Sequence, residues 1–308
     1  MVELIPKVER QLLREELNEK RFVRFTHFGS KEIYIIDANN APNVLREIGR
    51  LRELSFRAAG GGTGKSLDID AYDEGENPFQ QLLVWSPEDE EIVGGYRFIH
   101  CAKLAFDEQG KVKTPTSKLF HYSPQFIREY LPYTIELGRS FVQPDYQPAR
   151  NVRKGIYSLD NLWDGLGAIV LQSPDVKYFF GKITMYPHTD QLAREAIMYF
   201  LHKYFSDPDN LVYPYSPVKF KLDPHQLESI FKGENYEEDF KILQQFVRKR
   251  KENIPPLVNA YMNLSSTMRM FGTSVNKNFG NVEESGIMIT ISDIYDDKKD
   301  RHISNIRK

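Results

Sequence analysis

The sequence predicts an α+β fold built around one mixed, largely antiparallel sheet that is flanked by helices. The first half of the chain contains segments that alternate apolar and polar residues, as in a meander of strands, whereas the second half alternates strand-like with helix-like segments. No strong change in composition marks a second domain, and 308 residues suffice for one large domain with a sizeable core. We therefore expect a single domain with an N-terminal helix.

The N-terminal part, residues 1–42, is predicted to be a helix and hairpin extension. Apolar residues recur near a helical period in residues 1–20, and this helix either packs on the domain or rests on a membrane surface. Residues 22–38 alternate on both sides of Gly29-Ser30, which indicates a hairpin. The main domain then spans residues 43–295, and residues 296–308 are expected to form a flexible tail.

The main domain begins with a helix over residues 44–59, which Asn43 is expected to cap because the apolar residues after it fall on one face. Strands follow at 80–87 and 91–106, separated by a charged turn that contains Pro87. The later elements are, in order, a short helix and loop at 114–132, a strand at 134–144, a helix at 162–172, a strand at 175–187, a helix at 189–205 opened by Thr189-Asp190, a loop at 206–224, a helical stretch at 237–265 interrupted by Pro255-Pro256, and a strand pair at 268–275 and 285–295.

Composition excludes several classes of protein. A net charge of -2, from 41 basic and 43 acidic residues, gives little overall attraction to nucleic acid, and we expect none to be bound. No apolar run approaches the ~18 residues of a membrane-spanning helix. Cys101 is the only cysteine, and the histidines lack ligand spacing, so neither a disulfide nor a metal site is expected. These features are typical of a cytoplasmic protein.

Residues 59–66, Ala-Gly-Gly-Gly-Thr-Gly-Lys-Ser, are similar to a phosphate-binding loop. That loop requires a preceding strand and a following helix N-terminus, so that backbone N–H groups meet the phosphates. Here the order is reversed, and Ala59 replaces the first glycine. We therefore expect a mobile glycine hinge, or a flap over a substrate, rather than a nucleotide site.

A set of charged and aromatic residues recurs on successive predicted elements. Taken singly, each has an ordinary structural explanation, such as a cross-strand ion pair between Arg97 and Glu136. Taken together, they predict a buried charged network beside a pocket. The set consists of Arg52, Phe56, Asp68, Asp70, Tyr72, Asp73, Arg97, Glu136 and Arg139.

The spacing of this set resembles the acyl-homoserine-lactone synthases: Arg-x-x-x-Phe, then Asp-x-x-Asp, then Gly-x-x-Arg, then Glu-x-x-Arg. It resembles still more closely their relatives, the ornithine/glycine-lipid N-acyltransferases, once labelled hemolysin-like, and all of these share the Gcn5-related N-acyltransferase (GNAT) fold. The C-terminal half is similar to the lipid branch in the segments 162–167, 180–184 and 254–261. The resemblance covers residues 43–293.

The resemblance implies a transferase, an enzyme that moves a long fatty acyl chain, with or without a 3-hydroxyl group, to the amine of an amino acid such as ornithine or glycine. This would be the first step of aminolipid synthesis, a branch of lipid biosynthesis. No permanently bound cofactor is implied, and the donor would be the acyl-phosphopantetheine thioester of acyl carrier protein. That donor is favoured over acyl-coenzyme A because the fold's pyrophosphate loop is degenerate at residues 148–155, where only Gly155 remains. The implied location is cytoplasmic, with peripheral contact at the inner membrane face as an option.

Two alternatives stay open for the activity. One is signal synthesis like that of the acyl-homoserine-lactone synthases, with S-adenosylmethionine as the amine donor. The other is a non-catalytic module that binds an acyl carrier protein or lipid.

The resemblance also assigns roles to individual residues. Glu136 is the expected catalytic base, because an ammonium must lose a proton before it attacks a thioester. A backbone N–H near Phe141 or Val142 would polarise the thioester carbonyl. The donor's phosphate and an acidic carrier protein would meet Arg150, Arg153, Lys154 and Gly155, although a solvated basic loop is the alternative there. The expected substrate-binding residues are Arg52, Phe56, Asp70, Asp73, Arg97 and Arg139. Arg97 and Arg139 either bind the amino acid's carboxylate or order Asp70 and Asp73.

Overall fold

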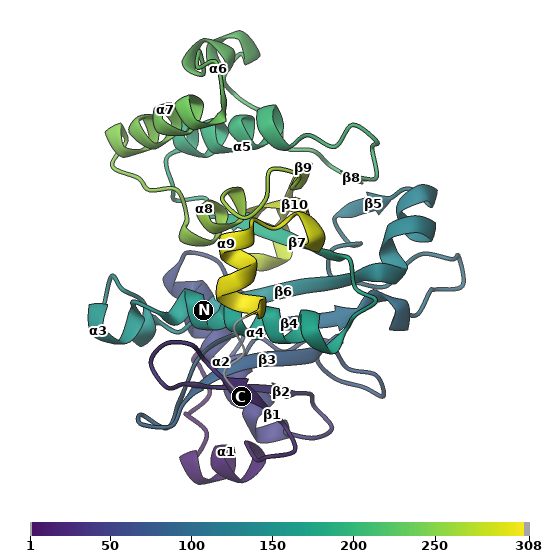
Figure 1. Ribbon diagram of the computed structural model, residues 1–308, viewed down its shortest axis with the longest axis vertical. Helices are drawn as coiled ribbons and strands as arrows, with labels where there is room; N and C mark the ends of the chain where they lie inside the picture. The colour runs from purple at the N-terminus through teal and green to yellow at the C-terminus, as the bar shows by residue number, and fades with distance from the viewer. Residues whose placement is uncertain (1, 305–308) are drawn as a thin grey trace. The chain divides into compact units, whose positions relative to one another are not determined.

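The computed structural model describes residues 2–304, which divide into two compact units (Figure 1). Unit 1 consists of the described residues within 1–104, 135–176 and 295–308, and unit 2 consists of residues 105–134 and 177–294. Both ends of the described chain therefore belong to unit 1. The boundaries predicted at 42/43 and 295/296 stay predictions, and residues 305–308 of the expected tail lie outside the described residues.

Unit 1 is built around an antiparallel sheet in the strand order β1-β2-β3-β4-β6 (Figure 1). The predicted hairpin at residues 22–38 is confirmed, with Gly29 and Ser30 in its turn at φ 75° and 47°. The strands predicted on either side of the charged turn, and the strand at 134–144, are confirmed as well, although the second of them ends at His100 rather than at residue 106. Their bounds are β1 (Phe22–Phe25), β2 (Glu32–Ile36), β3 (Gln80–Ser86), β4 (Glu91–His100) and β6 (Thr134–Val142).

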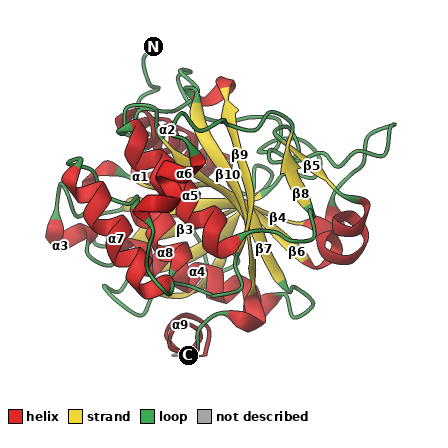
Figure 2. Ribbon diagram, turned by 90° about the horizontal axis from the view of Figure 1, so that it is seen from above, coloured by secondary structure: helices red, strands yellow, loops and turns green. Residues whose placement is uncertain are grey.

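Two long helices, α2 (Pro42–Ala58) and α4 (Ser158–Gln172), cover opposite faces of this sheet. On β3, the side chain of Gln81 accepts a hydrogen bond from Arg52 of α2, whereas the neighbouring Leu82 lies against Gly165 of α4. Since successive residues of a strand point to opposite faces, the two helices must lie on opposite sides. Figure 2 shows α2 and α4 on opposite sides of β3. The shorter helices of unit 1 are α1 (Arg10–Glu16), η1 (Cys101–Lys103), η4 (Pro144–Tyr146), α3 (Val152–Gly155), α9 (Asp296–Lys299) and η7 (Asp300–Ser304).

The start of the chain differs from the prediction in two ways. The N-terminal helix, α1, is much shorter than residues 1–20. The prediction that Asn43 caps α2 is also wrong, because Ala41 occupies the cap position without a side-chain bond. Instead, the Glu16 carboxylate at the end of α1 accepts hydrogen bonds from the N–H groups of Asn43 (3.1 Å) and Val44 (2.8 Å). A carboxylate at a helix N-terminus also interacts favourably with the positive end of the helix dipole.

Residues 296–304, expected to belong to a flexible tail, form α9 and η7. His302 of this segment is buried, and its Nδ1 lies 2.8 Å from Oδ1 of Asp164 in α4. A Cβ on Gly167 would lie 2.0 Å from the His302 carbonyl oxygen. Gly167 therefore allows this backbone to approach α4 closely.

Unit 2 contains an antiparallel sheet in the order β7-β10-β9 and a small sheet of β5 and β8. The predicted final strand pair is confirmed, and the predicted helical stretch is interrupted at Pro255-Pro256 as expected. The loop expected at 206–224 contains a short strand, and a further helix follows it. The elements are β5 (Phe120–Tyr122), η2 (Phe126–Tyr130), η3 (Leu131–Tyr133), β7 (Tyr178–Met185), α5 (Gln191–Phe205), β8 (Val212–Pro214), α6 (Pro224–Ile230), α7 (Tyr236–Lys249), α8 (Pro256–Met262), β9 (Arg269–Asn276), η5 (Lys277–Phe279), β10 (Val282–Thr290) and η6 (Ile291–Asp293).

The predicted α+β fold with a largely antiparallel sheet flanked by helices is confirmed. In residues 2–304, no helix is both long and apolar enough to cross a membrane.

Candidate functional site

The predicted charged set gathers on the α2 face of the unit 1 sheet. Gln81 of β3 is directly opposite Arg97 of β4, and Arg97 is in turn opposite Gly138 of β6. Ile99 of β4 is opposite Glu136. Residues directly opposite each other, and alternate residues of one strand, share a face of a sheet. Arg97 and Glu136 therefore lie on the face that α2 covers.

The register between β4 and β6 shifts around Arg139. Gly95 of β4 is opposite Phe141 of β6, and Arg97 of β4 is opposite Gly138 of β6. Two steps along β4 therefore correspond to three steps along β6. The extra residue of β6 forms a β-bulge, and Arg139 has a φ of 50° within it. The bulge changes the alternation of β6, so that Phe141 shares the face of Gly138.

Asp73 is held between two buried arginines. Its Oδ1 lies 3.0 Å from Nη1 of Arg52, and its Oδ2 lies 2.8 Å from Nη1 of Arg97. The side chains of Arg52 and Asp73 are completely buried, and that of Arg97 is 2% exposed. Burial by itself would raise the pKa of Asp73, but the two guanidinium groups outweigh it and lower this pKa to about 2.

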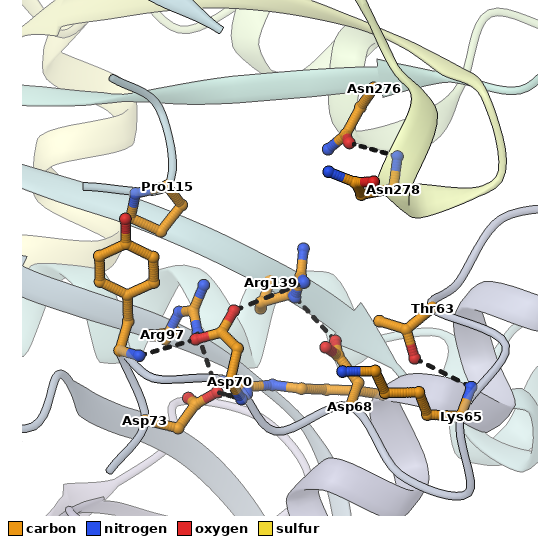
Figure 3. Close-up of polar contacts among 12 residues, drawn as sticks. Thr63, Lys65, Asp68, Asp70, Asp73, Arg97, Pro115, Arg139, Asn276 and Asn278 are labelled. Atoms are coloured by element: carbon orange, nitrogen blue, oxygen red, sulfur yellow. Dashed lines mark hydrogen bonds and ion pairs between the residues drawn. The ribbon is translucent and has the colours of Figure 1, made fainter. Parts of the chain in front are cut away.

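Asp70 connects this pair to a second one (Figure 3). Its Oδ1 lies 2.7 Å from Nη1 of Arg97, and its Oδ2 lies 3.7 Å from Nη2 of Arg139. Arg139 also places Nε 2.7 Å from Oδ2 of Asp68. Asp68 is almost completely buried, and this burial raises its pKa, although the positive charge of Arg139 acts in the opposite direction. The result is a continuous alternation of acid and base from Arg52 to Asp68.

Gln81 belongs to the network, although no pattern in the sequence indicates it. Nη2 of Arg52 donates to Oε1 of Gln81, while Nε2 of Gln81 donates to Oδ1 of Asp73 at 3.0 Å. Gln81 thus supplies an acceptor to the arginine and a donor to the carboxylate. The signal that could have found it is its position opposite Arg97 in the β3–β4 hairpin.

Glu136 is 3% exposed and lies near two other titratable groups. Burial, reinforced by the charges of Glu136 and Asp70, raises the pKa of Tyr72 to about 12. Burial and then the charge of Glu136 raise the pKa of Cys101. The phenol and the thiol therefore stay protonated near this carboxylate at neutral pH, and neither can accept a proton there.

The position of Gly138, between Glu136 and the bulge, leaves open space. A Cβ built on Gly138 would meet no described heavy atom within 4 Å. Arg97 is directly opposite Gly138, so this space lies between a cation on one strand and a carboxylate two residues along the other.

The two predicted backbone donors on β6 point in opposite directions. Gln143 N–H donates to Val93 O of β4 at 3.0 Å. Because N–H groups of an antiparallel strand alternate in direction, Phe141 N–H is directed toward β4 and Val142 N–H away from it. The N–H and C=O of one residue point to the same side of an antiparallel strand. The Val142 carbonyl oxygen accepts a hydrogen bond from Nε2 of Gln147 at 2.8 Å rather than from β4, which agrees with this direction. Of the two, only Val142 N–H is directed away from β4.

Phe56 and the basic residues after β6 lie at separate places in unit 1. Phe56 is buried on α2, one turn after Arg52. Near α3, Arg150 lies 3.7 Å from exposed Asp145, and Lys154 lies 2.5 Å from Oδ1 of Asp89. That hydrogen bond with Asp89 raises the pKa of Lys154. Arg153 is exposed and has no described carboxylate within 4.0 Å.

Gly155 is needed for packing. A Cβ on Gly155 would lie 2.5 Å from the backbone nitrogen of Pro148 and 2.8 Å from the carbonyl oxygen of Tyr146. Backbone atoms cannot move aside as a flexible side chain can, so any larger residue would displace α3.

Across residues 2–304, no three His, Cys, Asp or Glu side chains are grouped so as to hold a metal ion.

Comparison with known proteins adds an independent set of findings. Residues 51–154 match the acetyltransferase (GNAT) domain family. A glycine N(alpha)-acyltransferase from Phocaeicola vulgatus is 53% identical over 308 residues, which are 100% of this chain and 94% of the relative. A glycine N(alpha)-acyltransferase from Bacteroides thetaiotaomicron is 54% identical over 303 residues, 98% of this chain and 90% of the relative.

Two solved acyl-homoserine lactone synthases are similar at a lower level. For LasI the TM-score is 0.42 at 10% identity, covering 90% of this chain and 97% of LasI. For the CoA-dependent BjaI with SAM and isopentyl-CoA the TM-score is 0.31 at 17% identity, covering 53% of this chain and 71% of BjaI.

Proposed function

This chain belongs to the family of the glycine N(alpha)-acyltransferases and is an acyltransferase of the GNAT fold, and from that premise we propose that it transfers a long fatty acyl chain from a thioester to the amine of glycine. The observation that carries the proposal is buried Glu136, on the same face as Arg97 and beside the open space at Gly138. Such a space can hold a small amino acid with its amine near a carboxylate.

Glu136 is the base of the proposed reaction. Glycine is mostly an ammonium ion at neutral pH, and Glu136, directly or through one water, accepts a proton so that the neutral amine can attack the thioester carbonyl. The new C–N bond forms as the C–S bond breaks. The nitrogen loses a second proton as the amide forms; this proton ends on the departing thiolate, while the proton first taken by Glu136 is released to water. Val142 N–H, which is directed away from β4, is the proposed donor to the carbonyl oxygen.

The sequence left two roles open for Arg97 and Arg139, and we assign one role to each. Arg97 is 2% exposed and already holds Asp70 and Asp73, so we assign it to ordering the network. Arg139 is 16% exposed and is the better candidate to bind the glycine carboxylate. Asp70 and Asp73, with Arg52 paired to Asp73, then hold the orientation of these arginines. Phe56 is buried one helical turn after Arg52 on α2.

The donor we propose is the phosphopantetheine thioester of acyl carrier protein, in preference to acyl-coenzyme A. Exposed Arg153 supports an electrostatic contact with an acidic carrier, whereas Lys154 and Arg150 already pair with Asp89 and Asp145. The product would be the first intermediate of an aminolipid, with or without a 3-hydroxyl group on the chain. We propose that the protein acts in the cytoplasm, in peripheral contact with the inner face of the membrane.

Transfer can be tested with purified protein, acyl carrier protein charged with a palmitoyl or 3-hydroxypalmitoyl chain, and isotope-labelled glycine. Mass spectrometry should detect labelled N-acylglycine, and parallel reactions with acyl-coenzyme A rank the donors by kcat/KM. Ornithine and S-adenosylmethionine in place of glycine test the other acceptors. If no donor gives N-acylglycine, the proposed acceptor is wrong, and an acyl lactone formed from S-adenosylmethionine would instead support signal synthesis.

A further inference from the structure

The glycine loop after α2, residues 60–66, is tied to a buried carboxylate. Glu53 of α2 is 0% exposed and accepts hydrogen bonds from Thr63 N–H (2.9 Å), Thr63 Oγ1 (2.8 Å) and Gly64 N–H (2.7 Å). Nε of Arg57 donates to the same carboxylate at 2.8 Å. Burial would raise the pKa of Glu53, but these donors together lower it, so the carboxylate is ionised at neutral pH.

The loop is also held from its other side by the start of the chain. Arg57 donates through Nη1 to Val2 O at 2.6 Å and through Nη2 to Lys65 O. Val2 N–H donates to Gly64 O at 3.2 Å, and Ile5 N–H donates to Ser66 O at 3.1 Å. The loop therefore lies between α2 and the N-terminal residues and is hydrogen-bonded to both, whereas the sequence predicts a mobile hinge or a flap.

The glycines of this loop have a definite use. Gly60, Gly62 and Gly64 have φ values of 85°, 95° and 77°, a region that residues with a side chain rarely adopt. A Cβ on Gly62 would lie 3.1 Å from Oε1 of Glu53. The backbone N–H groups thus form a small anion-binding concavity of the kind that phosphate loops use, and here the protein's own carboxylate fills it.

The loop leads directly into the acidic segment of the site. Asp68 follows Gly64 by four residues, its N–H donates to Gly49 O at 2.9 Å, and its carboxylate meets Arg139. Arg52, the residue before Glu53, binds Asp73 at the far end of the same segment. Adjacent residues of α2 therefore hold the two ends of the segment that carries the site's aspartates.

We propose that Glu53 is a positioning residue for acyl transfer: by fixing the glycine loop, it sets Asp68 and Asp70 in the register at which they orient Arg139 toward the acceptor. The kinetic consequence rests on the proposed function, because it concerns binding of the amine acceptor. The structural consequence, an ordered segment from residue 60 to residue 73, does not depend on the substrate.

The chain offers a matched control on the same helix. Glu47 is also buried on α2, pairs with Arg50, and accepts a hydrogen bond from Val8 N–H at 3.1 Å, but it makes no bond to the glycine loop. Glu53→Gln and Glu47→Gln both replace a buried carboxylate with an amide of the same size. Only Glu53→Gln should raise the KM for glycine, by about 10-fold, and only it should speed hydrogen exchange in residues 60–73.

A milder variant keeps the proposal testable if Glu53→Gln folds poorly. Thr63→Val removes one donor to Glu53 and should give a smaller change in KM and exchange, in the same direction. The proposal is overturned if exchange in residues 60–73 is unchanged, or if it rises while KM stays at the Glu47→Gln value. If the wild-type protein acylates no glycine, the proposed function fails on its own, and the exchange comparison still decides whether Glu53 orders the segment.

Discussion

Arg52 and Asp73 form an ion pair at 3.0 Å, and neither side chain exposes any surface to solvent. The two residues are 21 positions apart, on a helix and on the loop before β3, so the pair joins the two segments across the interior of unit 1. A buried charge that loses its partner is costly, because neither water nor another ion replaces the lost contact.

Arg52→Met should lower the free energy of unfolding by about 3 kcal/mol, because Asp73 would stay buried with Arg97 as its remaining cation. Urea denaturation followed by circular dichroism measures the change. As a control, Arg10→Met removes a pair with Glu91 in which Arg10 is 57% exposed, and should cost less than about 1 kcal/mol. Equal losses in the two variants would contradict a stabilising role for the buried pair.

Asp73 should contribute to acid sensitivity. Its pKa is about 2 in the folded protein, below the ~3.9 of an unfolded aspartate. Its stabilisation is therefore fully present above about pH 4 and is lost as the pH falls toward 2. Asp73→Asn removes this pH-dependent contribution to stability. The unfolding free energy of the variant should therefore fall less steeply between pH 5 and pH 2 than that of the wild type. Identical slopes would show that Asp73 is not the group responsible.

Glu136→Gln should reduce kcat by about 100-fold or more at neutral pH, because the amide cannot accept the proton of the ammonium. The loss should shrink as the pH rises toward the pKa of the amine near ~10, since more glycine is then neutral. Steady-state rates from pH 6 to pH 10, with a melting curve to establish folding, measure both effects. Wild-type kcat at pH 7 would exclude Glu136 as the base.

Gly138→Leu should fill the open space beside Glu136 and raise the KM for glycine at least about 10-fold, with little loss of stability, because its Cβ meets no described atom. Gly155→Ala provides the contrast: its Cβ would collide with backbone atoms of Tyr146 and Pro148, so it should lower the melting temperature. Enzyme assays and thermal melts of both variants separate the effects. Unchanged glycine kinetics in Gly138→Leu would place the acceptor elsewhere.

Arg153→Glu should raise the KM for acyl carrier protein, and the difference from the wild type should shrink in high salt, because exposed charges are screened. Arg248→Glu, an exposed charge reversal on α7, is the control and should leave this KM unchanged. Kinetics at two salt concentrations with carrier-bound and coenzyme A donors measure the effect. A similar rise for both variants would indicate a general effect of charge rather than a docking site.

The strands of unit 1 could be predicted because their signals are local. The hairpin around Gly29-Ser30 and the strands carrying Arg97 and Glu136 follow from period-2 alternation and turn residues, both of which depend only on neighbours in sequence. The spacing of Arg52, Asp70 and Asp73 also indicated a shared network, and the structure brings these residues together.

Other parts of the site depend on contacts between distant segments, and no local pattern reports them. Glu16 caps α2 in place of Asn43, Gln81 completes the Arg52–Asp73 pair, and Glu53 holds a loop that composition predicts to be mobile. The bulge at Arg139 is visible only in the pairing of β4 with β6. The sequence by itself determined the main strands, the long helices and which charged residues belong together, because propensity and periodicity are properties of short segments. Only the tertiary structure decided how those charges pair and where space remains, because register and burial are set by the whole fold.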